Sequence, residues 1–334
     1  MHRDFYTTDL TKLLKLFIDN EEALNPALPF KKLFNLLSRL RHMLRHNSIS
    51  MSKKNIYEHY DLSNDFYKQI LDTTMTYSCA VFEDPANNLK EAQINKIRLL
   101  ITKAKISKEH HVLEIGSGWG AFAIEAVKQT GCRVTGLTLS PSQLQFAQQK
   151  VKEQALEDRI DFQLLDYRHT KGLYDRVISC EMIEAVGHKY MPVYFKSIDR
   201  LLKQDGIAVI QAITMPDQRY EVYRHTVDFI QKYIFPGALL PSFSYMSQIL
   251  CKHTGLLIEH VENIGPHYAK TLSLWRENLI ANRDDIYKLG FDDTFLRKWI
   301  YYFCYCESGF SKRIINNIQI VLTREKNETL NPQI

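Results

Sequence analysis

The sequence predicts an α/β protein with a mostly parallel sheet that carries helices on both faces. From about residue 90, helical patterns alternate with short apolar strands, and this alternation is typical of βαβ units. A glycine-rich turn follows the first of these strands, as in sheets that bind a ligand at their carboxyl edge. At 334 residues, with 45% hydrophobic and 24% charged residues, the chain has the composition of a folded globular protein.

Residues 1–54 form a predicted N-terminal helical, basic amphipathic segment. The stretch KKLFNLLSRLRHMLRH, residues 31–46, places its apolar residues on one helical face. Residues 31–54 hold seven Lys or Arg and no Asp or Glu. Two interpretations stay open. The segment is either a helix docked on the body with a solvated basic back, or a basic helix facing anionic lipid, where each basic residue contributes about 1 kcal/mol.

The next elements follow in order from their patterns. EAQINKIRLLITKAK predicts a helix, HHVLEI the first strand, and AFAIEAVKQT the helix after the glycine turn. CRVTGLTLS predicts the second strand, and Ser140 and Pro141 open the helix PSQLQFAQQKVKEQ as cap and first-turn residues. IDFQLLDY, YDRVISCEM and GIAVIQAIT predict three further strands, with the helix MPVYFKSIDRLLKQ before the last of them. The final hundred residues predict aromatic-rich helices and a last strand, NIQIVLTR, which we expect at the sheet edge.

The glycine turn VLEIGSGWGAF, residues 112–122, lets a ligand approach the backbone near a helix N-terminus. Its glycines, Gly116, Gly118 and Gly120, do not follow the GxGxxG fingerprint of nicotinamide cofactors, because Ala121 comes next. The second strand also ends in GLTLS, without the acid that a nicotinamide ribose requires. The E-x-G-x-G-x-G form resembles the S-adenosylmethionine site of class I methyltransferases. Asp166, at the tip of the third strand, either accepts from the adenine amino group or caps the strand end.

Charge and cysteines limit the classes of function. A net charge of +5 is too small to predict a nucleic-acid partner. The six cysteines are scattered without a CxxC pair, so we predict no metal site and a reducing, cytoplasmic location. We find no signal-peptide pattern and no apolar run near the ~20 residues of a membrane span.

From about residue 56 to 324 the chain resembles the cyclopropane-fatty-acyl-phospholipid synthases and their relatives, the mycolic acid cyclopropane synthases. The resemblance is carried by HYDLSNDFY (59–67), MTYSCAVF (75–82), EAQ.NK (91–96), LEIGSGWG (113–120), VTGLTLSPSQ (134–143), YDRVISCEMIEAVGHKY (174–190), FIQKYIFPGALLPS (229–242), VENIGPHYAKTLSLWREN (261–278) and YYFCYCESGF (301–310). The form CEMIEAVGHKYM with DFIQKYIFPG is most similar to the branch that includes plant cyclopropane synthases. Residues 1–54 fall outside these motifs.

The resemblance implies a Rossmann-like class I methyltransferase domain over residues 55–330, with a helical, lipid-binding acyl-channel insertion around 215–310. It implies S-adenosylmethionine and bicarbonate as cofactors. The cis double bond of an unsaturated phospholipid acyl chain would accept the methyl group, and a protein-bound bicarbonate would deprotonate the resulting carbocation to close a cyclopropane ring. We therefore expect a cytoplasmic protein peripherally associated with the inner face of an anionic membrane, with no nucleic-acid partner. A homodimer is kept as a hypothesis.

The resemblance also implies a set of cofactor-binding residues. Tyr77 and Ser78 match contacts to the methionine part of the cofactor, and Thr138, Leu139 and Gln143 match contacts to the ribose and adenosine. The full predicted set is Tyr77, Ser78, Glu114, Gly116, Gly118, Gly120, Thr138, Leu139, Gln143, Asp166 and Tyr167.

A second set of residues is implied at the bicarbonate site. Cys79 is expected to donate through its backbone amide, Ile213 to offer its backbone, and Tyr268 to contribute its hydroxyl. Bacterial members often have a histidine where this chain has Gln211. Glutamine can donate to and accept from the anion, but it cannot titrate near pH 7.

The carboxylate that orients bicarbonate is expected to be Glu184. Glu181, three residues earlier, is the rival carboxylate, but the family's spacing to Val186 and Gly187 favours Glu184. The aromatic residues of YDLSNDFY and TYSCAVF would surround the carbocation, and each face would contribute ~0.5–2 kcal/mol through cation–π attraction.

Three alternatives remain at this point. Plant small-amine N-methyltransferases share much of the architecture and the Tyr-Ser-Cys step, and they need no bicarbonate. A lipid methyltransferase would lose its proton elsewhere and yield a methyl-branched or methylene chain. The third alternative, an inactive lipid-binding module, is disfavoured by the intact Glu184, Tyr268 and glycine turn.

Overall fold

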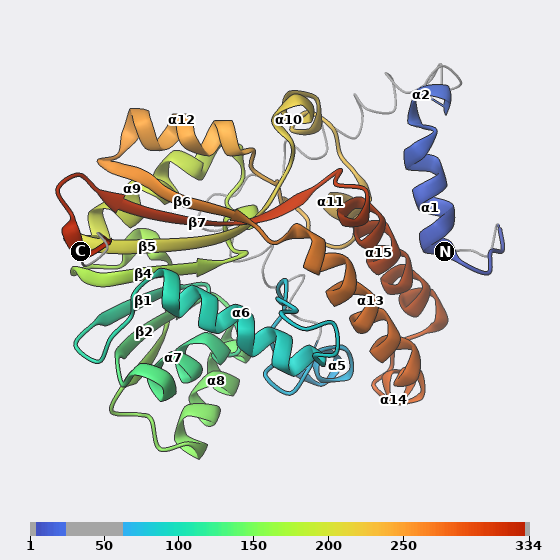
Figure 1. Cartoon of the computed structure of the whole chain (residues 1–334). Helices are drawn as coiled ribbons and strands as arrows, with labels where there is room; N and C mark the ends of the chain where they lie inside the picture. The colour runs from blue at the N-terminus through green and yellow to red at the C-terminus, as the bar shows by residue number, and fades with distance from the viewer. Residues whose placement is uncertain (1–4, 25–62, 331–334) are drawn as a thin grey trace.

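The computed structural model describes residues 5–24 and 63–330, and they contain one seven-stranded sheet with the order β3-β2-β1-β4-β5-β7-β6 (Figure 1). Five neighbouring strands run parallel to one another, and β7 pairs antiparallel with both β5 and β6. The strands are β1 (His111–Ile115), β2 (Arg133–Thr138), β3 (Ile160–Leu164), β4 (Tyr174–Cys180), β5 (Leu202–Thr214), β6 (Leu256–Asn263) and β7 (Asn316–Arg324). The α/β fold class is confirmed. The basic helix expected at residues 31–46 lies outside the described residues.

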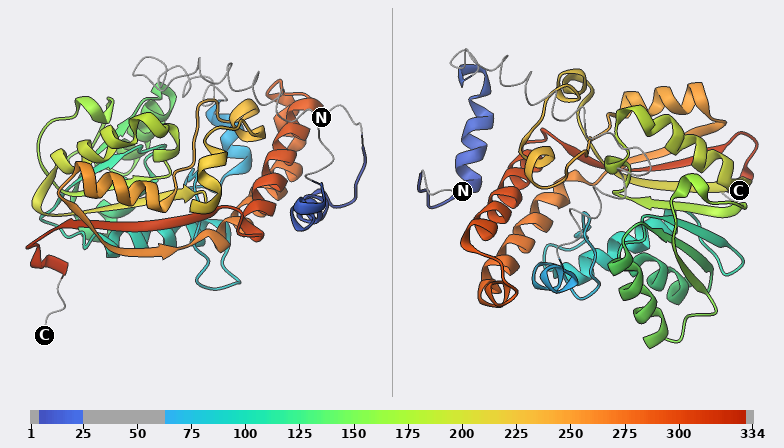
Figure 2. Two further views of the ribbon diagram at one scale, coloured as in Figure 1. Left: turned by 90° about the horizontal axis from the view of Figure 1, so that it is seen from above. Right: turned by 180° about the vertical axis from the view of Figure 1, so that it is seen from behind.

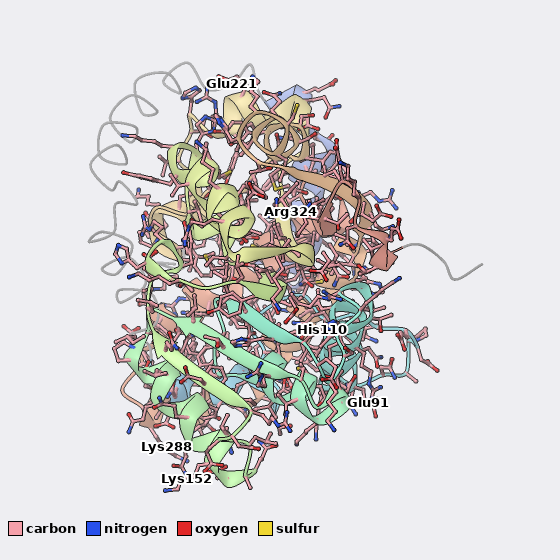
Figure 3. All side chains as sticks on the ribbon, turned by 90° about the vertical axis from the view of Figure 1, so that its left-hand side faces the viewer. Glu91, His110, Lys152, Glu221, Lys288 and Arg324 are labelled. Atoms are coloured by element: carbon pink, nitrogen blue, oxygen red, sulfur yellow. The ribbon has the colours of Figure 1, made fainter. Side chains whose placement is uncertain are left out.

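Helices cover both faces of the sheet. On one face α6 (Leu89–Lys103), α7 (Ala121–Thr130) and α8 (Pro141–Glu153) form one apolar core with the strands. On the other face α9 (Met191–Leu201) and α12 (Phe243–His253) form a second core. Local signals fix these helix starts: Ser140 caps α8 ahead of Pro141, and a capping box joins Asn88 to Glu91 at the start of α6 (Glu91 is labelled in Figure 3).

A third core, rich in aromatic side chains, is formed by helices that lie beyond the sheet in Figures 1 and 2. It is built mainly from α5 (Asn64–Ile70), α13 (Gly265–Ala281) and α15 (Asp293–Ser311). The remaining helices are α1 (Leu10–Asp19), α2 (Glu21–Leu24), α10 (Asp217–Tyr223), α11 (Phe229–Tyr233) and α14 (Arg283–Lys288). The range 215–310, expected as an insertion, also contains α12 and β6, which pack with the sheet.

The N-terminal helix α1 packs along α15, so two helices far apart in the sequence lie side by side (Figure 1). The Thr11 hydroxyl donates to Glu307 at 3.1 Å, and Arg276 donates to Thr11 at 2.8 Å. Near the other end of α1, Lys312 pairs with Asp19 at 2.6 Å. The contacts attach this helix to the aromatic core.

The position expected for the last strand was wrong. The strand β7 lies between β5 and β6 rather than at the edge, and the edge strand β6 was not predicted. The sequence of β6, LLIEHVEN, is polar and mostly exposed, as suits an edge strand, and so lacks the apolar pattern that marks the others. Its place beside β7 puts two polar residues of β7, Asn317 and Gln319, in the buried interior of the sheet.

Candidate active site

The glycine turn after β1 forms one wall of a cavity of about 200 Å³ at the carboxyl ends of the parallel strands. Gly116 and Gly118 have φ of +86° and +52°, in the left-handed region that glycine adopts without strain. A Cβ at position 116 would come within 2.9 Å of the Met182 side chain. The turn therefore keeps the backbone open toward the cavity.

The structure brings ten of the eleven predicted cofactor residues to this cavity. They are Tyr77, Ser78, Glu114, Gly116, Gly118, Thr138, Leu139, Gln143, Asp166 and Tyr167. Gly120 does not line it. Gly120 instead caps α7 with φ +90°, and a Cβ there would meet Phe162 at 2.9 Å, so its role is close packing of helix on strand.

Asp166 caps the short turn Tyr167–His169, which was one of its two expected roles. Arg168 grips the carboxylate with two hydrogen bonds, Nε to Oδ1 at 2.8 Å and one terminal nitrogen to Oδ2 at 2.6 Å. Burial opposes ionisation here, but the bonds from Arg168 hold the pKa of Asp166 below its usual value. The adenine contact stays a prediction.

Two buried ionisable side chains, Glu114 and Lys96, also line this cavity. The Oε2 atom of Glu114 is buried without a hydrogen-bond partner, and burial raises the pKa of this carboxyl well above its usual value. Lys96 donates to the Ser78 hydroxyl at 2.8 Å. An orphaned acceptor beside a bare glycine turn suits a ligand with cationic groups, so these residues fit S-adenosylmethionine. The sequence reasoning missed Lys96, although a lysine on the apolar face of a helix is a signal.

A second, mostly apolar cavity of about 810 Å³ adjoins the first. Its walls come from α10, α11, α13, α15 and also α1, through Leu14, Phe17 and Ile18. Three residues, Tyr77, Glu181 and Ala185, line both cavities. A ligand in the first cavity and a ligand in the second would therefore meet beside Tyr77 and Glu181.

Aromatic rings surround Tyr77 at this junction. The Tyr77 ring lies 5.3 Å from that of Tyr67 and 5.0 Å from that of Trp275, measured between centroids. Its hydroxyl is 3.1 Å from the Tyr302 hydroxyl. The YDLSNDFY and TYSCAVF motifs, expected to form an aromatic wall, do place Tyr67 and Tyr77 side by side. Tyr77 lines both cavities, whereas Tyr67 and Trp275 are fully buried and line neither, so of these three rings it is Tyr77 that can stabilise a cation there by π attraction.

The donors expected around bicarbonate converge on Glu181. Its Oε1 atom accepts from the Cys79 amide at 3.0 Å, the Gln211 side chain at 2.8 Å and the Asn317 side chain at 2.5 Å. Its Oε2 atom accepts from the Tyr268 hydroxyl at 2.7 Å. The structure thus brings three predicted residues together, and it adds Asn317, which the sequence reasoning missed.

The other end of the Gln211 side chain is also occupied. Gln211 is opposite Gln319 in the β5–β7 ladder, and its Oε1 accepts from the side-chain Nε2 of Gln319 at 2.9 Å. Both side chains are fully buried. Polar residues at alternate positions of the otherwise apolar β7 strand, Asn317 and Gln319, were a sequence signal for this buried network.

Glu184 lies outside the ring of donors around Glu181, and its expected role as the carboxylate that orients bicarbonate stays a prediction. Its Oε1 accepts from the Ile213 amide at 2.6 Å, and its Oε2 is buried without a partner. Burial, and then the negative charge of Glu181, raise the pKa of Glu184 to about 8. Glu184 therefore carries a proton near neutral pH. The two carboxylates are separated because the chain turns sharply after β4, at Glu181, before the short helical turn that holds Glu184.

Bicarbonate does not fit the residues predicted to hold it. The Cys79 amide, the Gln211 amide group and the Tyr268 hydroxyl all donate to Glu181, and the Ile213 amide donates to Glu184. Each predicted donor is therefore already satisfied by a carboxylate of the chain. In the described part of the chain, no group of three or more His, Cys, Asp or Glu is arranged to hold a metal ion.

Comparison with known proteins identifies the family of this chain. A model of the mycolic acid cyclopropane synthetase family matches residues 47–320. Tuberculostearic acid methyltransferase UfaA1 of Mycobacterium tuberculosis is 41% identical over 332 residues, covering 97% of this chain and 77% of the relative. The cyclopropane-fatty-acyl-phospholipid synthase of Escherichia coli is 34% identical over 267 residues, covering 80% and 67%.

Solved structures show the same fold. Mycolic acid cyclopropane synthase CmaA1, complexed with SAH and CTAB, superposes with a TM-score of 0.77 at 32% identity, covering 81% of this chain and 98% of that chain. Fold and glycine-turn cavity together define a class I S-adenosylmethionine-dependent methyltransferase. Within that class, the chain belongs to the mycolic acid cyclopropane synthetase family.

Proposed function

We propose that this protein transfers a methyl group from S-adenosylmethionine to the cis double bond of an unsaturated acyl chain of a membrane phospholipid. The observation that carries the proposal is the pair of cavities that meet at Tyr77 and Glu181. The larger cavity is mostly apolar and within the ~300–1,000 Å³ range of small-molecule sites, which suits an acyl chain.

The chain's residues would act by positioning and by excluding water. When bound, S-adenosylmethionine supplies an electrophilic methyl group on a sulfonium sulfur. An alkene is a weak nucleophile, so the two cavities must hold the double bond in line with that methyl group. The Tyr77 ring, which lines both cavities and packs against Tyr67 and Trp275, would then stabilise the carbocation that forms on the acyl chain.

Two products can follow from the same carbocation. Loss of a proton from the transferred methyl group with ring closure gives a cyclopropane, as the name of the Escherichia coli relative suggests. Loss of a proton without ring closure gives a methylene or methyl-branched unsaturated chain. The second outcome is favoured by the 41% identity to tuberculostearic acid methyltransferase over 97% of this chain.

The test is lipid mass spectrometry after incubation of the purified protein with S-adenosylmethionine and vesicles of a monounsaturated phospholipid. We expect acyl chains that gain one CH₂ unit, and saturated control vesicles that do not change. Mild hydrogenation then separates the products, because a ring resists it and an alkene takes up hydrogen. A protein that leaves unsaturated lipid unchanged but methylates small amines would contradict the proposal and support the N-methyltransferase alternative.

Association with an anionic membrane surface belongs to the same proposal, since the substrate resides in a bilayer. Among the described helices, none is long and apolar enough to cross a membrane. The access route would be at the membrane surface, and the basic residues of 31–54 support it through their charge.

A further inference from the structure

Glu181 holds its carboxylate at the junction of the two cavities by means of a strained backbone. Its φ is +49°, in the left-handed region, which is strained for a non-glycine residue. The residue directly follows β4, and its amide donates to the Gln211 carbonyl at 2.8 Å. A backbone strain of this kind persists where the surroundings enforce it, and such positions concentrate at functional sites.

In all its side-chain hydrogen bonds among the described residues, the Glu181 carboxylate is the acceptor. The carboxylate accepts four hydrogen bonds, and all four come from neutral groups. No cation of the described residues forms a salt bridge with it. Tyr268 remains a phenol donor, since burial, and then the charge of Glu181, raise its pKa well above the usual value. Three of these four donors, Cys79, Gln211 and Tyr268, are residues that the family resemblance assigns to an external anion.

The two oxygens of Glu181 differ in their free capacity. A carboxylate oxygen has two lone pairs. Oε1 already accepts three hydrogen bonds, whereas Oε2 accepts one, from Tyr268. Of the contacts among described residues, none other engages Oε2, so Oε2 has capacity to take up a proton.

We propose that Glu181 is the general base of this protein and takes the place of bicarbonate. The inference rests on the proposed function, because it names the proton acceptor of that reaction. The π electrons of the alkene form a bond to the methyl carbon as the carbon–sulfur bond breaks and its electron pair leaves with sulfur. The resulting carbocation loses a proton to Oε2 of Glu181, and the electron pair of the broken C–H bond forms either the ring bond or a new double bond. Glu181 becomes a neutral acid and returns its proton to water when the product leaves.

Glu184 complements this assignment. With its proton in place it adds no second negative charge to the site, so one carboxylate takes the position of one anion. The reaction consequently needs no dissolved carbonate.

Two variants of Glu181 test the assignment in buffer purged of carbon dioxide, with added sodium bicarbonate compared against sodium chloride at equal ionic strength. Glu181→Gln keeps the shape and loses the base. Glu181→Gly removes the carboxylate and relieves the backbone strain, because glycine tolerates φ +49°. Glu157→Gln, at an exposed glutamate in the turn between α8 and β3, is the matched control.

We expect the same lipid turnover by the wild-type protein with either salt. Both Glu181 variants should lose about 10² or more in turnover in purged buffer, the usual contribution of a general base. Bicarbonate should restore part of the turnover in Glu181→Gly alone, because only that variant frees the four donors for an anion. A wild-type protein that is inactive when purged and active with bicarbonate, or a Glu181→Gln variant with wild-type turnover, would overturn the assignment.

A readout without lipid separates this inference from the proposed function. In thermal unfolding, bicarbonate should raise the melting temperature of Glu181→Gly and leave that of the wild type unchanged. Titration with S-adenosylmethionine shows whether each variant is folded. If Glu181→Gly does not fold, the turnover of Glu181→Gln in purged buffer tests the assignment. If the wild type makes no product from any unsaturated lipid, the proposed function fails. A saturable melting-temperature rise of the wild type with bicarbonate would still refute the base assignment by itself.

Discussion

Glu181 and Glu184 are three residues apart, yet the fold gives them opposite chemistry. Glu181 accepts four hydrogen bonds, whereas Glu184 has one from Ile213 and an unpartnered oxygen. Burial without donors favours the protonated acid, and a full set of donors favours the carboxylate. Under the assignment proposed above, Glu184 keeps its proton and Glu181 is the carboxylate that receives one.

The raised pKa of Glu184 predicts how stability depends on pH. Its pKa is about 8 in the folded protein and 4.5 in its ordinary state. Between pH 4.5 and about pH 8 the folded chain keeps a proton that the unfolded chain has released. The free energy of unfolding therefore falls as the pH rises through this range and no longer changes through Glu184 above about pH 8. Glu184→Gln cannot ionise and should escape it. We expect its melting temperature, relative to wild type, to rise steadily from about pH 5 to pH 8.

Calorimetric scans at several pH values measure this difference, with the exposed Glu157→Gln variant as control. A difference between Glu184→Gln and wild type that stays constant over the range would show that Glu184 is ionised in the folded protein.

At the scale of elements, the glycine turn after β1 requires glycine for two reasons, a left-handed φ and a close approach to a side chain, and substitutions can separate them. Gly116 has φ +86° and would bring a Cβ within 2.9 Å of Met182. Gly290, after α14, has φ +92° but open space around it. Alanine at either position incurs the backbone cost of roughly 1–2 kcal/mol. Only the alanine at position 116 would also place a methyl group against Met182 in the lining of the cofactor cavity.

We therefore expect Gly116→Ala to weaken S-adenosylmethionine binding by about tenfold or more, and Gly290→Ala to lower the melting temperature alone. Titration calorimetry and thermal unfolding of both variants provide the two measurements. Trimming the obstruction in a Gly116→Ala, Met182→Ala double variant should return part of the affinity. Equal cofactor affinity in the two single variants would mean that the turn does not touch the cofactor.

For the whole molecule, the cavities connect the sheet to the helices beyond it. The sheet side provides the glycine turn, and α10, α11, α13, α15 and α1 enclose the apolar cavity. Phe17 and Leu14 of α1 reach that cavity although they lie in the N-terminal segment, outside the family motifs. The mostly apolar cavity thus draws on the N-terminal helix α1 as well as on helices from the second half of the chain.

The basic residues of 31–54 predict affinity for an anionic membrane surface. Replacement of Arg39, Arg41 and Arg45 by glutamine removes three positive charges, each worth about 1 kcal/mol near an anionic surface. We expect at least a tenfold loss of affinity for anionic vesicles in sedimentation assays, and unchanged cofactor affinity. Vesicle affinity equal to that of wild type would favour the alternative of a docked helix with a solvated basic back.

Much of this protein was determined by the sequence alone, because helix periods, apolar strands, caps and the glycine turn are local patterns. They sufficed to predict the fold class and most elements from residue 90 onward, though not β6. The motifs that carry the family resemblance implied eleven cofactor residues, of which ten line the cofactor cavity. Only the tertiary structure decided which carboxylate receives the donors, since Cys79, Gln211, Tyr268 and Asn317 are up to 238 positions apart and meet through packing. The same holds for β7, whose place depends on the polar edge strand β6 that covers it. Spacing could identify two glutamates as candidates, but only the three-dimensional convergence of donors could separate their roles.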